Sequence, residues 1–505
     1  MKSDSECINN EKSPKWDGAG LEHVVCKICK AVKNGDMSGV RELLETYNDS
    51  TSLRNKCMWF AAQYGKVDVV KFLIQNGADV NAVDKRKHTF DRTGLLLALE
   101  RGHFDVAKLL IQSGADVNIV DGYEKKSPLH VAAKVGRINV VKVLIQNGAQ
   151  VNYGDKDNYT ALHRAVRNGY VDVAKLLILN GADVNLAESL GRWTALHFAC
   201  DKGHLEIVKI LIENGAKVNM LTKIHGDALM RACSSCVSVD VVKYLISHGS
   251  NVNRATKWGW TPLRYLSSVS NKYDDNRLIV CNMLISNGAN VNVNADSTMH
   301  GANTPLYEAC SIGLVFIAKL LIQNGAHVNA QNMWGTTPLI TAALQGHFEI
   351  LKLLIRNGAD VNMLNNNKSS ALDLTAAAGR RVESCRNCVL YLVCCGAEIN
   401  ELALRNDQSD VLRVVKEWTN AMKSGKPISK DLCRKHLSPA EQHYLFELAF
   451  TFAVRCGIVA CRVFCTVRSY ITFRGLFMSY DFKCGYDNIW DGPDLNHSLF
   501  NDTDW

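Results

Sequence analysis

The chain has 505 residues, a net charge of +8 and a pI of about 8.6, so it can build a large core and is only mildly basic. Its basic residues are spread out, and we interpret the densest group, residues 85–88, as a solvated loop tip. We therefore expect no specific binding to a nucleic acid. No uncharged apolar run of about 18 residues occurs, and residues 1–20 are polar, which argues against a transmembrane segment and a secretory signal.

The first part of the chain has no regular repeat. Residues 1–22 are polar, and we expect them to be disordered. Residues 23–55 carry a two-helix pattern that is broken at Gly35, with charged residues on one side. Because a terminal unit of a stacked-repeat protein has a neighbour on one side only, we interpret residues 23–55 as a degenerate N-terminal capping repeat.

From residue 56 to residue 400 one unit recurs ten times. Its ending, a variant of Gly-Ala-Asp-Val-Asn, returns at steps of 33 to 39 residues. A period of this length is typical of a protein built from stacked structural repeats. The endings occupy residues 76–81, 113–118, 147–152, 180–185, 214–219, 248–253, 287–292, 324–329, 357–362 and 395–400.

The fourth unit predicts a pair of short helices. Thr160 is a good N-cap, because its hydroxyl can accept a hydrogen bond from the next turn. Apolar residues at 162–166 predict a first helix that ends at Gly169, and those at 173–177 predict the apolar face of a second helix. Gly181 follows that helix, where a left-handed residue is favoured. Neither helix can bury its apolar face alone, so neighbouring units must stack.

The openings and endings of the units resemble ankyrin repeats over about residues 23–420. The resemblance implies an all-α solenoid of paired antiparallel helices with β-turn fingers, which binds partner proteins on a concave side formed by the fingers and the first helices. It also implies a scaffold or adaptor without catalysis, and hydroxylation of endings such as Val80-Asn81. The openings are Ser127-Pro128-Leu129-His130, Thr160-Ala161-Leu162-His163 and Thr194-Ala195-Leu196-His197.

Several units depart from the common length or composition. The eighth has a long finger at 294–303, whereas the seventh and tenth have inserts between their helices, around 271–276 and 379–383. Insertions fall in loops because the helices must keep their stacking register. The sixth unit opens on Asp227 and has Cys236-Val237 in place of the usual glycine, so we expect it to be the weakest.

The chain after the repeats predicts a different organisation. Residues 401–423 are interpreted as C-terminal capping helices, and residues 424–505 as a linker, one helix from about 439 to 454 and a poorly specified tail. Leu432-Cys433-Arg434 resembles part of a box that recruits ubiquitin ligases, although Ser429 replaces the leucine expected four residues earlier. The alternative function is therefore a substrate-recognition subunit of a ubiquitin ligase.

No catalytic or metal site is predicted. The sequence contains no P-loop, dinucleotide fingerprint, nucleophile elbow or metalloprotease motif, so we expect no enzymatic activity and no cofactor. The 18 cysteines are expected to be reduced thiols in a cytoplasmic or nuclear protein, and the half-sites at 26–29, 233–236 and 385–388 lie in distant units. The recurring His130, His163 and His197 are too far apart to share a metal, and we expect each to hydrogen-bond backbone near its turn.

Large aromatic residues mark the predicted binding surface. They stand just before the openings of the units, and aromatic residues are frequent anchors of interfaces. We place the main docking surface across the seventh to ninth units, with the finger 294–303 closing over a bound segment; the alternative is that each ring only packs against its own turn. The rings are Tyr159, Trp193, Trp258, Trp260 and Trp334, accompanied on the first helices by Gln63, Tyr64, Arg167, Asn168, Asp201 and Lys202.

Overall fold

A computed structural model describes residues 19–46, 51–84, 92–224, 226–234, 238–268, 275–293, 302–378 and 383–398. All of these belong to the first of two units, Met1–Arg413. The second unit, Val414–Trp505, lies outside the described residues. The predictions for residues 1–18, for the capping helices at 401–423 and for the linker and tail therefore fall outside the description.

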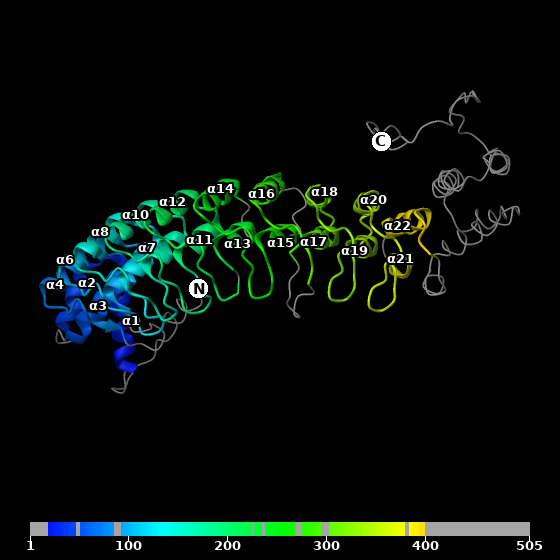
Figure 1. Ribbon diagram of the computed structural model, residues 1–505. Coiled ribbons are helices and arrows are strands. Elements are labelled where there is room, and N and C mark those ends of the chain that lie inside the picture. Colours follow the sequence, from blue (N-terminus) through cyan, green and yellow to red (C-terminus); the bar gives the residue numbers. More distant parts are fainter. Residues whose placement is uncertain are drawn as a thin grey trace, which may run out of the picture. The chain divides into compact units, whose positions relative to one another are not determined.

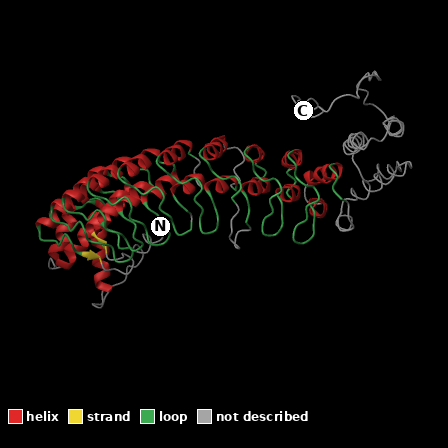
Figure 2. Ribbon diagram, viewed as in Figure 1, coloured by secondary structure: helices red, strands yellow, loops and turns green. Residues whose placement is uncertain are grey.

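The described chain folds into antiparallel helix pairs that stack in single file, as two rows (Figure 1). The loops that join successive pairs stand along one side as fingers (Figure 2). The inner row, next to the fingers, consists of α1 (Ala19–Asn34), α3 (Thr51–Gln63), α5 (Gly94–Arg101), α7 (Pro128–Val135), α9 (Ala161–Arg167), α11 (Ala195–Lys202), α13 (Ala228–Ser234), α15 (Pro262–Ser267), α17 (Pro305–Ile312), α19 (Pro338–Leu344) and α21 (Ala371–Ala378). The outer row consists of α2 (Met37–Thr46), α4 (Val67–Gln75), α6 (Phe104–Gln112), α8 (Ile138–Gln146), α10 (Val171–Leu179), α12 (Leu205–Glu213), α14 (Val239–Ser247), α16 (Asp275–Ser286), α18 (Val315–Gln323), α20 (Phe348–Arg356) and α22 (Glu383–Cys394).

The core is a ribbon between the two rows. In the fourth unit Leu162, Ala165 and Val166 of α9 and Val173 and Leu177 of α10 are all buried. Successive inner helices contact one another from α1 to α21, and successive outer helices from α4 to α22, so neighbouring units bury the apolar faces along the stack. The predicted all-α repeat architecture is confirmed.

Short antiparallel pairing occurs in the fingers. Strand β1 (Val83–Asp84) pairs with β2 (Arg92–Thr93) at the base of the second unit's finger, with Val83 opposite Thr93. A single bridge joins Ala187 to Thr194 in the finger of the fifth unit. These pairings are the β component of the predicted finger.

The predicted helix caps are formed. The side chain of Thr160 accepts a hydrogen bond from the backbone N–H of His163. Thr304 and Thr337 make the same bond to Tyr307 and Ile340, at 3.2 Å in both cases, and proline follows each of these two threonines. Proline suits this position because the first helical residue needs no N–H partner.

The recurring histidines tie each unit to the following finger. The backbone N–H of Thr160 donates to Nδ1 of His163 at 3.1 Å, so the ring proton is on Nε2, which donates to the Leu186 carbonyl at 3.1 Å. Burial lowers the pKa of His163 and of His197 to about 4, so both rings are neutral at pH 7. The predicted bond to backbone is confirmed; His130 and His197 bind the carbonyls of Tyr159 and Met220.

The asparagine that closes each ending joins two units, a role that the sequence analysis did not identify. The side-chain amide of Asn185 donates to the Gly215 carbonyl at 3.0 Å, while its oxygen accepts from the Lys217 N–H at 2.8 Å. Both bonds recur at nine successive endings, and we call this series the asparagine ladder. Its members are Asn81, Asn118, Asn152, Asn185, Asn219, Asn253, Asn292, Asn329 and Asn362.

Two predicted boundaries at the N-terminus differ from the structure. Helix α1 begins at Ala19, so residues 19–22 are helical and are not part of a disordered segment. Helix α3 runs from Thr51 to Gln63 and crosses the predicted boundary between residues 55 and 56. The capping repeat has no Gly-Ala-x-Val-Asn ending, so the sequence carries no landmark for where it stops.

The sixth unit uses an acid where other units use a hydroxyl. Oδ1 of Asp227 accepts from the Met230 N–H at 3.0 Å and thereby caps α13. The side chain is completely buried, and its Oδ2 has no hydrogen-bond partner. Burial raises the pKa of Asp227 to about 6. Residues 236–237 of this unit lie outside the description, and its weakness stays a prediction.

Candidate functional site

A shallow hollow opens on the inner side of the fourth and fifth units. It has a volume of about 290 Å³ and is lined by Tyr159, Trp193 and Phe198 together with charged residues of α9 and α11. The ring centre of Phe198 lies 5.0 Å from that of Trp193 and 5.8 Å from that of Tyr159. Two of the predicted rings are thus brought together by a phenylalanine that the sequence analysis did not single out.

The fingers that carry these rings are held by side-chain acceptors. The buried carboxylate of Glu188 accepts backbone N–H bonds from Leu190 and Gly191, each at 2.7 Å, and from Trp193 at 3.1 Å. Asp155 does the same in the preceding finger, where it accepts from Tyr159 at 2.9 Å. These carboxylates accept hydrogen bonds from the backbone of their own fingers, so each finger is a preformed loop.

A second hollow, of about 250 Å³, lies between α7 and α9. Its charged lining includes Lys126, Lys134 and Arg164. The guanidinium of Arg164 also stands 4.7 Å from the ring centre of Tyr159, so the two hollows share a wall. Burial, reinforced by Arg164 and Lys134, lowers the pKa of Lys126.

The two tryptophans of the seventh unit are engaged locally. The ring centre of Trp260 lies 5.0 Å from that of Tyr265 and 4.1 Å from Cζ of Arg264. Arg264 is itself 1% exposed and bonded to Glu308 at 2.9 Å. Trp258 is half-buried, with Nζ of Lys257 4.7 Å from its ring centre. Trp260 therefore packs on its own unit, and whether it also contacts a partner stays a prediction.

Trp334 is placed differently, at the tip of the finger before the ninth unit. Trp334 is 53% exposed, its neighbour Met333 is 42% exposed, and Leu364 on the next finger is 48% exposed. Asn366 of the next finger donates from its backbone to the Trp334 carbonyl at 3.0 Å and from its side chain to the Met333 carbonyl at 2.9 Å. We call Met333, Trp334 and Leu364 the fingertip platform.

The position of each ring relative to its helix cap explains these differences. Tyr159, Trp193 and Trp260 directly precede the cap, and each contacts a residue one turn into its own unit's inner helix. Trp334 stands three residues before its cap, where no such contact occurs in the described chain. Trp258 also stands three residues before its cap but is half-buried, so the offset marks the three packing rings and does not by itself identify a projecting one.

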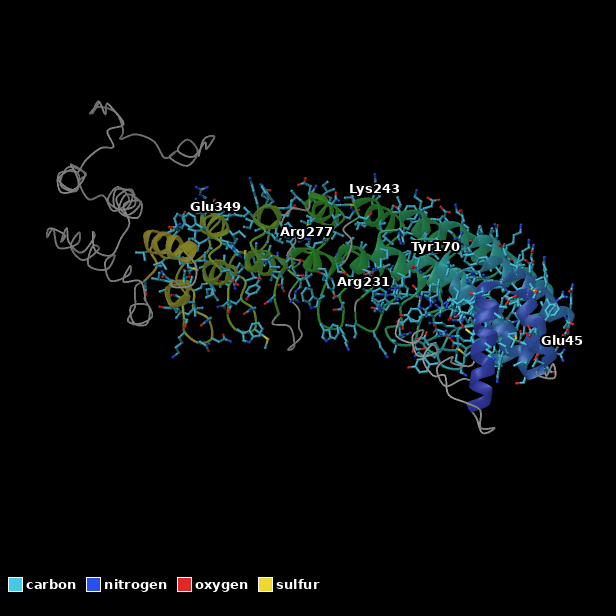
Figure 3. The ribbon with its side chains drawn as sticks, turned by 180° about the vertical axis from the view of Figure 1, so that it is seen from behind. Glu45, Tyr170, Arg231, Lys243, Arg277 and Glu349 are labelled. Atoms are coloured by element: carbon cyan, nitrogen blue, oxygen red, sulfur yellow. The ribbon has the colours of Figure 1, made fainter. Side chains whose placement is uncertain are left out.

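The other predicted site residues are spread along the inner side. Arg167, Asp201 and Lys202 line the first hollow, whereas Gln63, Tyr64 and Asn168 do not. Arg231 lies on the inner row near the fingers, while Lys243 and Glu349 point outward from the outer row (Figure 3). Most of the finger 294–303 is outside the described residues, so its closure over a bound segment stays a prediction.

The described ranges contain no group of three or more His, Cys, Asp or Glu side chains that could hold a metal ion. The thiols of Cys200, Cys233 and Cys310 are free and fully enclosed, and burial raises the pKa of each well above its ordinary value. Within the same ranges, no helix is long and apolar enough to cross a membrane.

Comparison with protein families gives continuous matches. The family model described as ankyrin repeats (3 copies) matches residues 28–121, 95–188, 196–295, 229–332, 272–365 and 306–403. A second model, ankyrin repeats (many copies), matches residues 170–212. Together the matches run without a gap from residue 28 to residue 403, well over half of the 505 residues. A search of curated proteins finds no match.

Proposed function

The chain belongs to the ankyrin-repeat family, and from that premise we propose that it is a scaffold or adaptor that binds partner proteins through its fingers and inner helices. Ankyrin repeats are general modules of protein–protein interaction, and the family is typically non-catalytic. The proposed role needs no reaction at a side chain, only a surface that a partner can recognise.

The observation that carries the proposal is the fingertip platform. Three large apolar side chains, each more than 40% exposed, lie on two neighbouring fingers that hydrogen bonds hold in register. Exposed apolar clusters on a fixed frame are typical of interaction sites, because a partner that covers them gains free energy without ordering a loop. Trp334 is the natural anchor, since tryptophan is the residue type most enriched at interface hot spots.

The ubiquitin-ligase alternative has less support. Residues 429–434, on which it rests, lie outside the described chain, and the family matches end at residue 403. A ligase subunit would still need a substrate-binding surface, so the two functions differ only in what the C-terminal region recruits. No feature of the fingers or inner helices favours the ligase role.

Site-specific photo-cross-linking tests the proposed function. A photoreactive amino acid is placed at Met333 on the platform and, as a matched control, at Phe316, which is 74% exposed on the outer helix α18. Discrete protein adducts are expected from position 333 of the full chain in cells, and not from position 316. Identical adduct patterns from both positions, or none from position 333, would overturn the proposal.

A further inference from the structure

The two hollows on the inner side form one surface, which we call the inner groove. It is lined by residues of the third, fourth and fifth units and by Glu100 of α5 in the second unit. Arg164 joins its two parts, because it lines one hollow and stacks on the ring of Tyr159 in the other. The groove therefore spans three successive inner helices, α7, α9 and α11.

Basic side chains on this groove outnumber the acids that could neutralise them. Lys134, Arg167 and Lys202 are exposed, and neither Lys134 nor Arg167 makes an ion pair in the described chain. They lie in the last turns of three successive inner helices, where a cation is also stabilised by the helix dipole. One side of the groove thus presents three cations in a row.

The acids of the groove are already committed to structure. Glu100 pairs with Arg92 at 2.8 Å, and Asp201 pairs with Arg231 and, at 3.2 Å, with Lys202. Glu188 accepts three backbone N–H bonds of its own finger. Five basic side chains line the groove against these three acids, and Lys134 and Arg167 are exposed without an ion pair in the described chain, so the positive row faces solvent.

An apolar floor accompanies the basic row. The rings of Tyr159, Phe198 and Trp193 meet at centre distances of 5.0 to 5.8 Å, and Leu190 at the neighbouring fingertip is 65% exposed. Cζ of Arg231 also lies 4.6 Å from the ring centre of Trp193, so the aromatic group is held in place. A bound side chain would meet a rigid aromatic wall between cations.

We propose that the inner groove binds an acidic peptide segment in which carboxylates flank an aromatic or large aliphatic side chain. This inference deepens the proposed function and rests on it, by naming the chemistry of one partner. The carboxylates pair with Lys134, Arg167 and Lys202, and the apolar side chain covers Tyr159, Phe198 and Leu190. Charge-assisted hydrogen bonds to an extended segment also fix its direction along the helices.

A nucleic acid fits the same surface less well. Glu100, Glu188 and Asp201 line the groove together with the cations, and their negative charges oppose a continuous phosphate backbone. A peptide can place single carboxylates at the cations and an uncharged residue opposite the acids. The mixed pattern of the groove therefore favours a peptide.

Selection from a random peptide phage library on the full chain tests the inference. Enriched peptides are expected to carry two or more Asp or Glu residues around an aromatic or large aliphatic residue. Their affinity is then measured by fluorescence anisotropy for the full chain, for Lys134→Glu/Arg167→Glu, and for Lys142→Glu/Lys175→Glu. The last pair lies on the outer helices α8 and α10 of the same units and makes the same change of charge.

The groove variant is expected to lose about tenfold or more in affinity, and the outer variant less than about twofold at physiological salt. Failure to enrich acidic peptides, equal loss in both variants, or tighter binding of a labelled single-stranded RNA that competes with the peptide would overturn the inference. Circular dichroism confirms that each variant is folded. If position 333 still yields partner adducts while acidic peptides fail, the proposed function stands and the groove inference does not.

Discussion

Replacing Asp227 with threonine is expected to stabilise the sixth unit at neutral pH. The buried carboxyl has a pKa of about 6 in the folded chain, against an ordinary value of 3.8. Each pKa unit corresponds to about 1.4 kcal/mol, so ionising this group in the folded state costs about 3 kcal/mol at pH 7. Threonine keeps the acceptor for the Met230 N–H, as Thr304 does for Tyr307 at 3.2 Å, and removes the charge.

The sign of the pH dependence follows from the direction of the shift. Because the folded state holds the proton more tightly than the unfolded state, the cost of Asp227 is absent below about pH 4, grows between about pH 4 and 6, and is constant above. The difference between the threonine variant and the natural chain should therefore open over that interval. At pH 7 a difference of about 3 kcal/mol lowers the equilibrium constant for opening of α13 about 150-fold, and exchange of its amides slows by the same factor.

Hydrogen exchange of the α13 amides, corrected for intrinsic rates, measures this difference. The matched control is the reverse change, Thr337→Asp, at a cap that is 1% exposed and holds the Ile340 N–H at 3.2 Å. It should give α19 the pH dependence that α13 loses. Equal protection of α13 in the natural chain and in Asp227→Thr at pH 7 would refute the reasoning.

Three further outcomes are expected. His163→Gln should reduce acid sensitivity, measured as the pH profile of thermal unfolding. The folded pKa of about 4 against 6.5 contributes about 3 kcal/mol that is present above pH 6.5 and lost as pH falls toward 4. His197, whose pKa is also about 4, retains a similar contribution in the variant. Trp260→Ala should lower the free energy of unfolding by about 3 kcal/mol. Trp334→Ala should change the melting temperature little and weaken the binding of an identified partner by about 2 kcal/mol. A large drop in the melting temperature of Trp334→Ala would contradict the role given to the fingertip platform. Asn185→Ala should cost about 1–3 kcal/mol in urea unfolding, more than Asn180→Ala, whose amide bonds only the Leu176 carbonyl of its own helix.

The fold could be predicted because its signals are local and repeat. Thr160, Gly169 and Gly181 each affect only the helix ends next to them in the sequence, and the same pattern recurs in ten units. The bond from His163 to backbone was also predictable, since a buried imidazole must be satisfied nearby. The start of α3 was not, because the capping repeat lacks the ending that marks the other boundaries.

The candidate site was less accessible to sequence reasoning. The grouping of Tyr159 with Phe198 depends on how far one unit turns relative to the next, which no local pattern records. The residue that organises each finger also changes type, from Asp155 to Glu188 to Asn332, so its shared role appears only in three dimensions. The prediction that all five aromatic residues face a partner treated residues at two different offsets as equivalent.

The asparagine ladder joins successive units by the same pair of hydrogen bonds. Each of the nine endings in the ladder presents one amide N–H and one amide oxygen to the next unit, where a glycine carbonyl accepts from the first and a backbone N–H donates to the second. Because the same two groups are offered and received at nine successive joints, a recombination event that removes or duplicates a whole unit leaves matched connectors on both sides of the new joint. The number of units can thus change during evolution without the invention of a new interface, and the length of the stack can drift while the chemistry of its joints stays fixed.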